Sequence, residues 1–340
     1  MTNLTLQEIA NQAGVSLSTV SRVINNHPNV SDKVRNRVLK IIEETGYQPN
    51  AAARSLASQR SRVIGLVIPR SVHTFFTDPY FSRLTQGVAQ ACNLRDYTLS
   101  LFLFHTLDDD RKLFPRVSGK GFLDGVILQA TPGDTFVQQL SQGNIPFIVI
   151  GRPHLTEGVS YLDVDNINGA YTAVAHLIHL GHRRIATITG PLSTSVGKDR
   201  EQGYHKAMSD RGFSVNGELI VESDFTENGG YNAAKHLLRQ KPDAIFVASD
   251  TLTLGAMRAL REAGLSIPRD IAIVGYDDLP PARYTNPPLT TIRQPILRFG
   301  IKAVETLLDI IKNGNTPNRR IIFETELVIR ASCGSLMSTG

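Results

Sequence analysis

Side chains between residues 16 and 25 have the chemistry needed to contact double-stranded DNA. Arg22 can donate two parallel N–H groups to the edge of a guanine, and Leu17 can contact the methyl group of a thymine. The hydroxyls of Ser16 and Thr19 suit phosphate oxygens, which position a protein on DNA without reading its sequence. The alternative is an ordinary helical hairpin whose polar face is simply solvated.

Two short helices are needed to present these side chains, and capping residues predict both. Thr5 can cap a first helix, and Glu8 stands three residues later, as a capping box requires. Gly14 can adopt positive φ and end that helix, and Ser16 then caps a second one. Two helices joined by a tight turn that contains glycine form a helix-turn-helix, whose second helix enters the major groove.

A third helix is expected between Ser31, at its N-cap, and Gly46, at its end. The charge of the chain is concentrated in this region. Residues 1–62 hold eight Lys/Arg and four Asp/Glu and so carry +4 of the net charge of +5. A basic first fifth before a nearly neutral remainder is expected of a chain that binds a polyanion there.

From residue 63 the pattern changes to short apolar runs that alternate with helical periodicity. The alternation predicts βαβ units and two parallel sheets. The predicted strands are 63–68, 98–104, 123–129, 146–150, 185–189, 244–249 and 271–276. The predicted helices lie near 79–94, 134–143, 166–181, 196–212, 228–240, 251–264 and 295–313.

A second set of chemically competent residues follows these strands. Ligands of open α/β sheets bind beyond the carboxyl ends of the strands. Asp250 follows one predicted strand and Asp277 another, and the aromatic-rich segment 75–81 follows the first strand. Carboxylates can accept from vicinal hydroxyls, arginine can donate paired N–H groups, and an aromatic face can cover a ring. This combination suits a polyhydroxylated ligand.

Two motifs at a defined spacing carry a family resemblance. VSLSTVSRVIN (residues 15–25) followed by GYQPNAAARSLAS (residues 46–58) resembles the headpiece and hinge of the LacI/GalR family of bacterial transcription regulators. The resemblance implies an all-α helix-turn-helix headpiece and an α/β periplasmic-binding-protein-like core of two Rossmann-like subdomains. We expect a headpiece at 1–47, a hinge helix and linker at 48–61, and an effector-binding and dimerisation core at 62–334. Crossovers are expected near 161–164, 290–293 and 324–329, which gives subdomains of about 62–161 plus 291–323 and 162–290 plus 324–334.

The resemblance also assigns expected DNA contacts. Two hinge helices of a dimer would lie together in the minor groove, where Leu56 would act as an intercalating wedge; the alternative is that Leu56 is a core leucine. The expected DNA-binding residues are Thr5, Leu6, Ser16, Leu17, Ser18, Thr19, Ser21, Arg22, Asn25, Ser31, Tyr47, Asn50, Ala53, Arg54 and Leu56.

In the core, the resemblance implies an effector site. Arg200 stands in the family's R-x-x-G-[YF] pattern, Asp277 stands in VGYDD, and Phe225 occupies the place of a stacking aromatic. The segment 75–81 departs from the common Asn-Pro-Phe-Phe form and resembles that of members responding to maltose-type glucosides. The expected effector-binding residues are Phe76, Asp78, Tyr80, Arg200, Phe225, Asp250 and Asp277. Each has a purely structural alternative, as a helix-surface residue, a loop cap or part of the core.

Neither a cofactor nor a metal is expected. His176, His179 and His182 favour a helix end over a metal site, because basic residues there complement the helix dipole. Asp108–Asp110 is interpreted as a solvated helix start. The chain has two cysteines, an N-terminus without the pattern of a signal peptide, and no apolar run of membrane-spanning length, so we expect a cytoplasmic protein.

These observations predict a homodimeric transcription regulator, expected to be a repressor, that binds a pseudo-palindromic operator under the control of a sugar. A purine or another metabolite as effector or corepressor stays open, as does activation. A transport-type sugar-binding protein would need an export signal and no headpiece. An enzyme is disfavoured because the sequence has no dinucleotide fingerprint after its first strand, no nucleophile elbow and no P-loop.

Overall fold

The structure is a computed structural model that describes residues 4–24, 27–47, 60–104, 107–119, 121–130, 133, 135–155 and 157–335. Of residues 107–111 it describes the backbone only. The chain divides into two compact units, residues 1–61 and 62–340, and each is described by itself.

The first unit contains α1 (Leu6–Ala13), α2 (Leu17–Ile24) and α3 (Asp32–Thr45), as predicted. The predicted capping box is present: Glu8 N donates to Thr5 Oγ1 at 3.3 Å, and Thr5 N donates to Glu8 Oε2 at 2.6 Å. Gly14 has a φ of 60° and ends α1. Ser31 stands at the N-cap of α3, as predicted, although its side chain makes no capping hydrogen bond.

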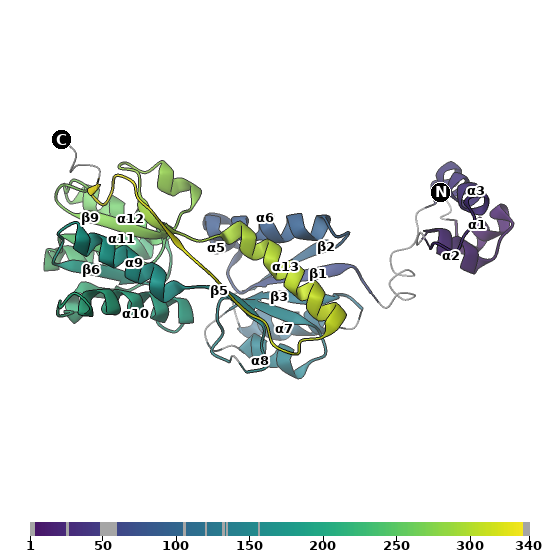
Figure 1. The fold of residues 1–340 in the computed structure, drawn as a ribbon, viewed down its shortest axis with the longest axis horizontal. Coiled ribbons are helices and arrows are strands. Elements are labelled where there is room, and N and C mark those ends of the chain that lie inside the picture. Colours follow the sequence, from purple (N-terminus) through teal and green to yellow (C-terminus); the bar gives the residue numbers. More distant parts are fainter. Residues whose placement is uncertain are drawn as a thin grey trace. The chain divides into compact units, whose positions relative to one another are not determined.

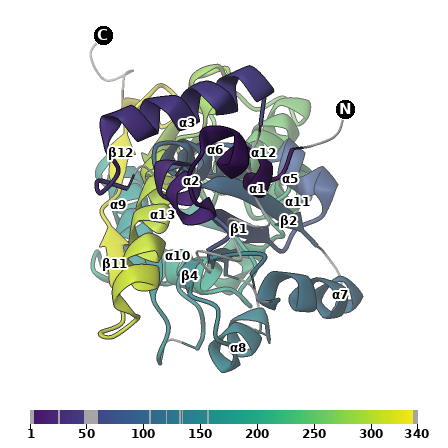
Figure 2. The ribbon, with the colours of Figure 1, turned by 90° about the vertical axis from the view of Figure 1, so that its right-hand side faces the viewer.

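The three helices pack around a small shared core (Figure 2). One face of each helix is apolar, and hydrophobic burial between these faces is what holds so short a unit together. The buried residues are Ile9, Ala10, Ala13, Val20, Val23 and Val38.

The second unit contains two six-stranded sheets, each covered by helices (Figure 1). The first sheet has the order β11-β5-β4-β3-β1-β2. All of its pairs are parallel. Its strands are β1 (Val63–Ile68), β2 (Thr98–Leu103), β3 (Gly125–Gln129), β4 (Phe147–Ile150), β5 (Tyr161–Val164) and β11 (Arg320–Phe323). Its helices are α5 (Val72–Thr77), α6 (Pro79–Asn93), α7 (Leu107–Ser118), α8 (Thr135–Gln142) and α13 (Ile296–Asn313).

The second sheet has the order β12-β10-β9-β8-β6-β7 and is parallel except for the pair β10–β12. Its strands are β6 (Ile185–Thr189), β7 (Ile220–Glu222), β8 (Ala244–Val247), β9 (Ala272–Asp277), β10 (Thr290–Arg293) and β12 (Glu326–Val328). Its helices are α9 (Asn166–His179), α10 (Ser195–Ser209), α11 (Glu227–Leu237) and α12 (Asp250–Glu262). Short 3₁₀ turns occupy Gly217–Leu219, Leu238–Gln240 and Pro280–Arg283. We call the sheet that contains β1 and its helices the first half of the core, and the other sheet with its helices the second half.

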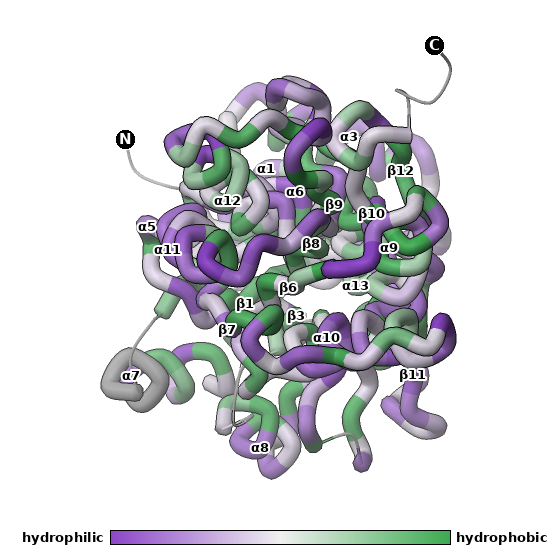
Figure 3. The backbone as a smooth tube through the Cα atoms, turned by 90° about the vertical axis from the view of Figure 1, so that its left-hand side faces the viewer, coloured by the Kyte–Doolittle hydropathy of each residue, from purple (hydrophilic) through white to green (hydrophobic). Residues whose placement is uncertain are grey.

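The inner strands of both sheets are buried between helices, as their apolar runs predict, whereas the edge strands β2, β7, β11 and β12 are partly exposed (Figure 3). In the first half, α6 and α13 approach so closely that glycine is needed at the contact. A Cβ added to Gly87 would lie 2.2 Å from the carbonyl oxygen of Leu297, and one added to Gly300 would lie 2.4 Å from that of Leu84. The backbones of α6 and α13, which both contribute residues to the site, are therefore in direct contact.

All seven predicted strands and all seven predicted helices are present. Among the described residues, the core also contains α5, α7, β5, β7, β10, β11 and β12, of which β5, β10 and β12 lie at the expected crossovers. The expected subdomain boundaries at 161/162 and 290/291 need correction. All of β5 pairs within the first sheet and all of β10 pairs within the second, so these crossovers follow Val164 and Arg293. No described helix is both long and apolar enough to cross a membrane.

Candidate ligand pocket and nucleic-acid interface

Helix α2 presents the polar face that the sequence predicts. Val20 and Val23 are buried, which turns Leu17, Ser18 and Arg22 outward, and Leu17 is 44% exposed although it is apolar. An exposed leucine beside an exposed arginine on a short helix suits base edges better than solvent.

Hydroxyl groups gather at the start of α2. The Ser16 Oγ lies 2.8 Å from the hydroxyls of both Ser18 and Thr19, and it accepts from the Thr19 N–H at 3.2 Å. Ser16 therefore caps α2, and its exposed group stands at the positive end of the helix dipole, where a phosphate oxygen is favoured. Ser21 and Thr19 are half-buried on the same helix.

The remaining expected DNA contacts lie in different surroundings. Thr5 and Ser31 are exposed, Leu6 is half-buried, and Tyr47 packs against the core of the first unit. Five expected contacts lie outside the described residues, namely Asn25, Asn50, Ala53, Arg54 and Leu56.

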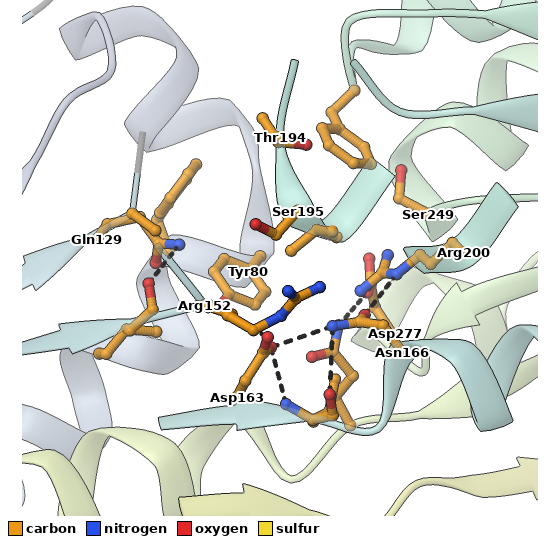
Figure 4. Close-up of a pocket in the computed structure, with 18 of the residues that line it drawn as sticks. Tyr80, Gln129, Arg152, Asp163, Asn166, Thr194, Ser195, Arg200, Ser249 and Asp277 are labelled. Atoms are coloured by element: carbon orange, nitrogen blue, oxygen red, sulfur yellow. Dashed lines mark hydrogen bonds and ion pairs between the residues drawn. The ribbon is translucent and has the colours of Figure 1, made fainter. Parts of the chain in front are cut away.

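The second unit contains a pocket of about 130 Å³ lined from both halves of the core (Figure 4). Asp78, Tyr80 and Gln129 come from the first half, and Arg200 and Asp277 from the second. Gln129 ends β3 and Asp277 ends β9, so the pocket lies at the carboxyl ends of parallel strands, as expected for an open α/β sheet.

Arg200 is the most constrained cation in this pocket. It is 4% exposed. Its Nε donates to Asn166 Oδ1 at 2.9 Å, and its Nη1 donates to the carbonyl of Ala248 and lies 3.6 Å from Asp277 Oδ1. Its guanidinium also lies 3.6 Å from the centre of the Tyr276 ring. These contacts fix the group and leave it partly neutralised.

Asp277 faces the pocket from a strained corner. Its φ is 120° and that of Asp278 is 52°, conformations that glycine favours and that cost other residues about 1–3 kcal/mol each. Gln294 Nε2 donates to Asp277 Oδ1 at 2.5 Å, while Arg293 and Arg330 bind the Asp278 carboxylate at 2.7 and 2.5 Å. Burial raises the pKa of Asp277 to about 7, and the nearby Arg200 charge opposes that rise.

Asp163, on β5, is a second buried carboxyl of the pocket. Its Oδ2 accepts from Arg152 N at 3.1 Å, and its Oδ1 accepts from Val164 N at 2.8 Å and from Asn166 Nδ2 at 3.0 Å. Burial raises its pKa to about 6. Asp163 was not predicted as a site residue, because residues 161–164 were expected only to form a crossover. The signal was a lone carboxylate inside the apolar run YLDV.

Asp78 and Tyr80 begin α6, and both line the pocket as expected. Asp78 caps the helix by accepting from Tyr80 N at 3.0 Å, and burial raises its pKa. Burial also raises the pKa of Tyr80, so its hydroxyl stays protonated and can donate.

Aromatic walls complete the site. Phe225 lines the pocket with a φ of 65° and packs its ring on Gly190, where an added Cβ would lie 2.0 Å from the ring. Only glycine leaves room for that ring. Phe81 and Phe299 line the pocket from the first half.

Two expected effector residues do not line the pocket. Phe76 is 74% exposed on α5 and points away from the core, whereas its neighbour Phe75 is buried. Asp250 is 1% exposed, but its Oδ2 accepts from Leu279 N at 2.8 Å and its Oδ1 from Thr291 Oγ1 at 2.6 Å. These bonds make Asp250 a brace between β10 and the loop after β9.

The pocket also contains amides and two further arginines, Arg70 and Arg152, that were not predicted from the sequence. Gln129 donates from Nε2 to the carbonyl of Ile150 at 3.2 Å, and its buried Oε1 has no partner among the described residues. Arg152, Asn166 and Gln294 line the same space. Gln129 stands at the end of an apolar run, and that position was the available signal.

His176 and His182, near the end of α9, contact different partners. His176 Nε2 lies 3.4 Å from Cys333 Sγ, and His182 lies 3.7 Å from Asp243. Within the described ranges, no three His, Cys, Asp or Glu side chains are grouped so that they could hold a metal ion. The side chains of Asp108–Asp110 are not among those described.

The two units thus combine a DNA-recognition helix with a two-sided ligand pocket, and this combination defines the class of ligand-controlled DNA-binding regulators. Comparison with known proteins agrees. Residues 5–50 match the model of bacterial regulatory proteins, lacI family, and residues 174–333 match that of a periplasmic binding protein-like domain.

Two relatives align along nearly the whole chain. The HTH-type transcriptional regulator CelR of Thermobifida fusca is 38% identical over 96% of this chain and 98% of its own. The HTH-type transcriptional repressor PurR of Actinobacillus pleuropneumoniae is 37% identical over 98% of this chain and 99% of its own. This chain belongs to the lacI family, and it is a transcription regulator rather than an enzyme.

Solved structures show the same arrangement. The transcriptional regulator CelR–cellobiose complex has a TM-score of 0.78 at 36% identity and covers 97% of this chain and 99% of its own. The lac repressor dimer bound to operator and the anti-inducer ONPF has a TM-score of 0.83 at 27% identity and covers 98% of this chain and 99% of its own. This chain is therefore a DNA-binding regulator whose core binds a small-molecule effector.

Proposed function

We propose that the protein is a cytoplasmic, homodimeric repressor whose effector is a neutral saccharide of the cellobiose or maltose type. The observation that carries the choice of effector is that Arg152 and Arg200 are each paired with a carboxylate of the protein. An anionic effector needs a cation free to pair with it, whereas a sugar needs fixed donors and acceptors around its hydroxyls.

Each of the three arginines among the described lining residues already has an internal partner. Arg200 has Asn166, Ala248 and Asp277. Arg152 has the Asp199 carboxylate, and Arg70 donates to the carbonyl of Pro69 at 2.9 Å. A phosphorylated sugar that bound at Arg152 or Arg200 would compete with the paired carboxylate, Asp199 or Asp277, which favours an uncharged ligand.

The other polar groups are suited to hydroxyls. Asp163 and Asp277 can each accept from a hydroxyl when ionised, and Gln129 offers a buried amide oxygen. Phe225 and Tyr80 provide faces for the C–H side of a pyranose ring. The CelR relative bound to cellobiose supports a glucoside in particular.

A purine is the second candidate. PurR relatives are 37% identical to this chain, and the aromatic faces of Phe81 and Phe225 could also stack on a base. The carboxyl and guanidinium groups of Asp277 and Arg200 could then hydrogen-bond the edge of that base.

For DNA, we propose that α2 enters the major groove of each operator half-site through Leu17, Ser18 and Arg22, with Ser16 and Thr19 on phosphates. The hinge segment would fold in the minor groove with Leu56 as its wedge. A Leu56→Gly variant should then lose specific operator binding while keeping effector binding. Retention of specific affinity would contradict the hinge proposal.

A thermal-shift screen of the purified protein against cellobiose, maltose, their phosphorylated forms and hypoxanthine tests the effector. A ligand at 100 times its Kd adds about 2.7 kcal/mol of stability, which raises Tm by several degrees. A shift with a neutral glucoside supports the proposal. A shift only with hypoxanthine or a phosphorylated sugar contradicts it.

A further inference from the structure

The polar contacts between the two halves of the core include three that join residues far apart in the sequence. Arg152, after β4, donates from Nη2 to both carboxylate oxygens of Asp199 on α10, at 2.5 and 2.6 Å. Next to it, His154 Nε2 lies 2.9 Å from the carbonyl oxygen of Ser193. On another side of the pocket, Thr251 Oγ1 donates to Asp78 Oδ1 at 3.4 Å. The two halves are therefore held together at more than one point around the cavity.

The Arg152–Asp199 pair is the charged member of this set, and it lies at the rim of the pocket. The Arg152 side chain is 39% exposed and that of Asp199 is 12% exposed. Arg152 is fixed within its own half as well, because its backbone N–H donates to Asp163. Figure 4 shows the guanidinium lying between labelled residues of the two halves, including Tyr80 and Ser195.

A structural ion pair within one half would only stabilise folding. This pair instead joins residues that are 47 positions apart and belong to different sheets, so it exists only while the halves are close. When the two halves separate and the pocket opens, Arg152 and Asp199 must therefore give up this bond and be hydrated by water instead. A charge-assisted bond of this kind changes a two-state equilibrium by about tenfold or more.

We propose that Asp199, which does not itself line the pocket, is a positioning residue that holds Arg152 across the rim and keeps the core closed around its effector. Entry and release of the ligand then require this bond to break, and its strength sets how long the ligand stays bound. The part of this inference that concerns how long the ligand stays bound rests on the proposed function. Closure of the two halves can be measured without a ligand.

The experiment measures the distance between the halves in the ligand-free full-length protein. Spin labels are placed on cysteines introduced by Gln142→Cys on α8 and Ser209→Cys on α10, both exposed. The native Cys92 and Cys333 are fully buried and are replaced by alanine if they react. Double electron–electron resonance then measures the distance between the labels in the parent protein and in two variants, Asp199→Asn and Arg152→Gln, which alter the bond from either side.

We expect both variants to populate a longer distance, and the parent protein to approach the same distribution at high salt, because screening weakens an exposed pair. The control is Arg95→Gln, which removes a 2.9 Å ion pair to Glu305 within the first half and whose arginine is about as exposed as Arg152. It should leave the distance unchanged. An unchanged distance in both Asp199→Asn and Arg152→Gln, measured on folded protein, overturns the inference.

Ligand kinetics separate this inference from the proposed function. If cellobiose binds the parent protein, its dissociation from Asp199→Asn should be about tenfold faster, and unchanged dissociation would count against the positioning role. If no saccharide binds the parent protein, the proposed effector is wrong, while the ligand-free distances still decide whether Asp199 holds the core closed.

Discussion

The carboxyl ends of β8 and β9 each carry an aspartate that the same reasoning assigned to the effector, and the two have different surroundings. Asp250, after β8, gives both of its oxygens to partners within the protein, Leu279 N and Thr291 Oγ1. Asp277, at the end of β9, accepts a hydrogen bond from Gln294 Nε2 and lines the pocket beside Arg200. A position after a strand therefore does not identify a ligand-binding carboxyl; unused hydrogen-bonding capacity inside a cavity does.

The largest expected effect on stability is that of Asp250→Ala. The change leaves Leu279 N and Thr291 Oγ1 buried without an acceptor, and we expect it to lower the free energy of unfolding by about 3 kcal/mol. Urea unfolding followed by circular dichroism measures it. A change below about 1 kcal/mol would show that Asp250 is not a brace and would reopen its assignment to the ligand.

The largest expected effect on ligand binding is that of Asp277→Asn combined with Arg200→Met. Removing the carboxylate and the guanidinium from the same pocket should weaken effector binding by about 100-fold or more, since hydrogen bonds to charged groups contribute about 1.5–3 kcal/mol each. Isothermal titration calorimetry with the ligand identified by the thermal-shift screen measures this loss. Asp250→Ala, if folded at the working temperature, is the matched control and should bind within a few-fold of the parent.

A smaller effect should appear in the pH dependence of stability. The folded pKa of Asp277 is raised to about 7 and that of Asp163 to about 6, so the folded chain holds protons that the unfolded chain has already released. Their contribution to stability is therefore lost as pH rises from about 4 to about 7. Urea unfolding between pH 5 and pH 8 should give a flatter profile for Asp277→Asn than for the parent. Parallel profiles would mean that Asp277 titrates near its ordinary pKa.

The smallest effect is expected for Phe76→Ala. Its side chain is 74% exposed and outside the pocket, so effector affinity should stay within about twofold of the parent. Phe225→Ala, which removes a pocket wall, is the comparison and should weaken binding by about tenfold or more. A tenfold loss of effector affinity in Phe76→Ala would show that α5 belongs to the binding site.

The phenylalanine pair shows where prediction from the sequence ends. The alternation of apolar runs and helical periods predicted seven strands and seven helices of the core, because those signals repeat over many residues. Helix α5 has six residues and was not predicted, so nothing in the sequence fixed which of Phe75 and Phe76 turns inward. The structure buries Phe75 and exposes Phe76.

The site shows the same limit. Asp78, Tyr80, Arg200, Phe225 and Asp277 were found from motif and position, and all five line the pocket. Asp163 and Gln129 could not be ranked in that way, because their importance depends on how two sheets bring their strand ends together. Edge strand β11 was missed for a related reason: its half-exposed residues lack a continuous apolar run.

The central claim is that a ligand bound in the pocket lined by Arg200 and Asp277 controls DNA binding by α2. The most direct test is fluorescence anisotropy with an operator selected from random DNA by the protein itself, titrated with and without cellobiose. We predict that the parent protein's operator affinity changes at least tenfold on adding ligand, and that Arg200→Met binds the operator equally well but no longer responds. An Arg200→Met protein that still responds as the parent does would contradict the account.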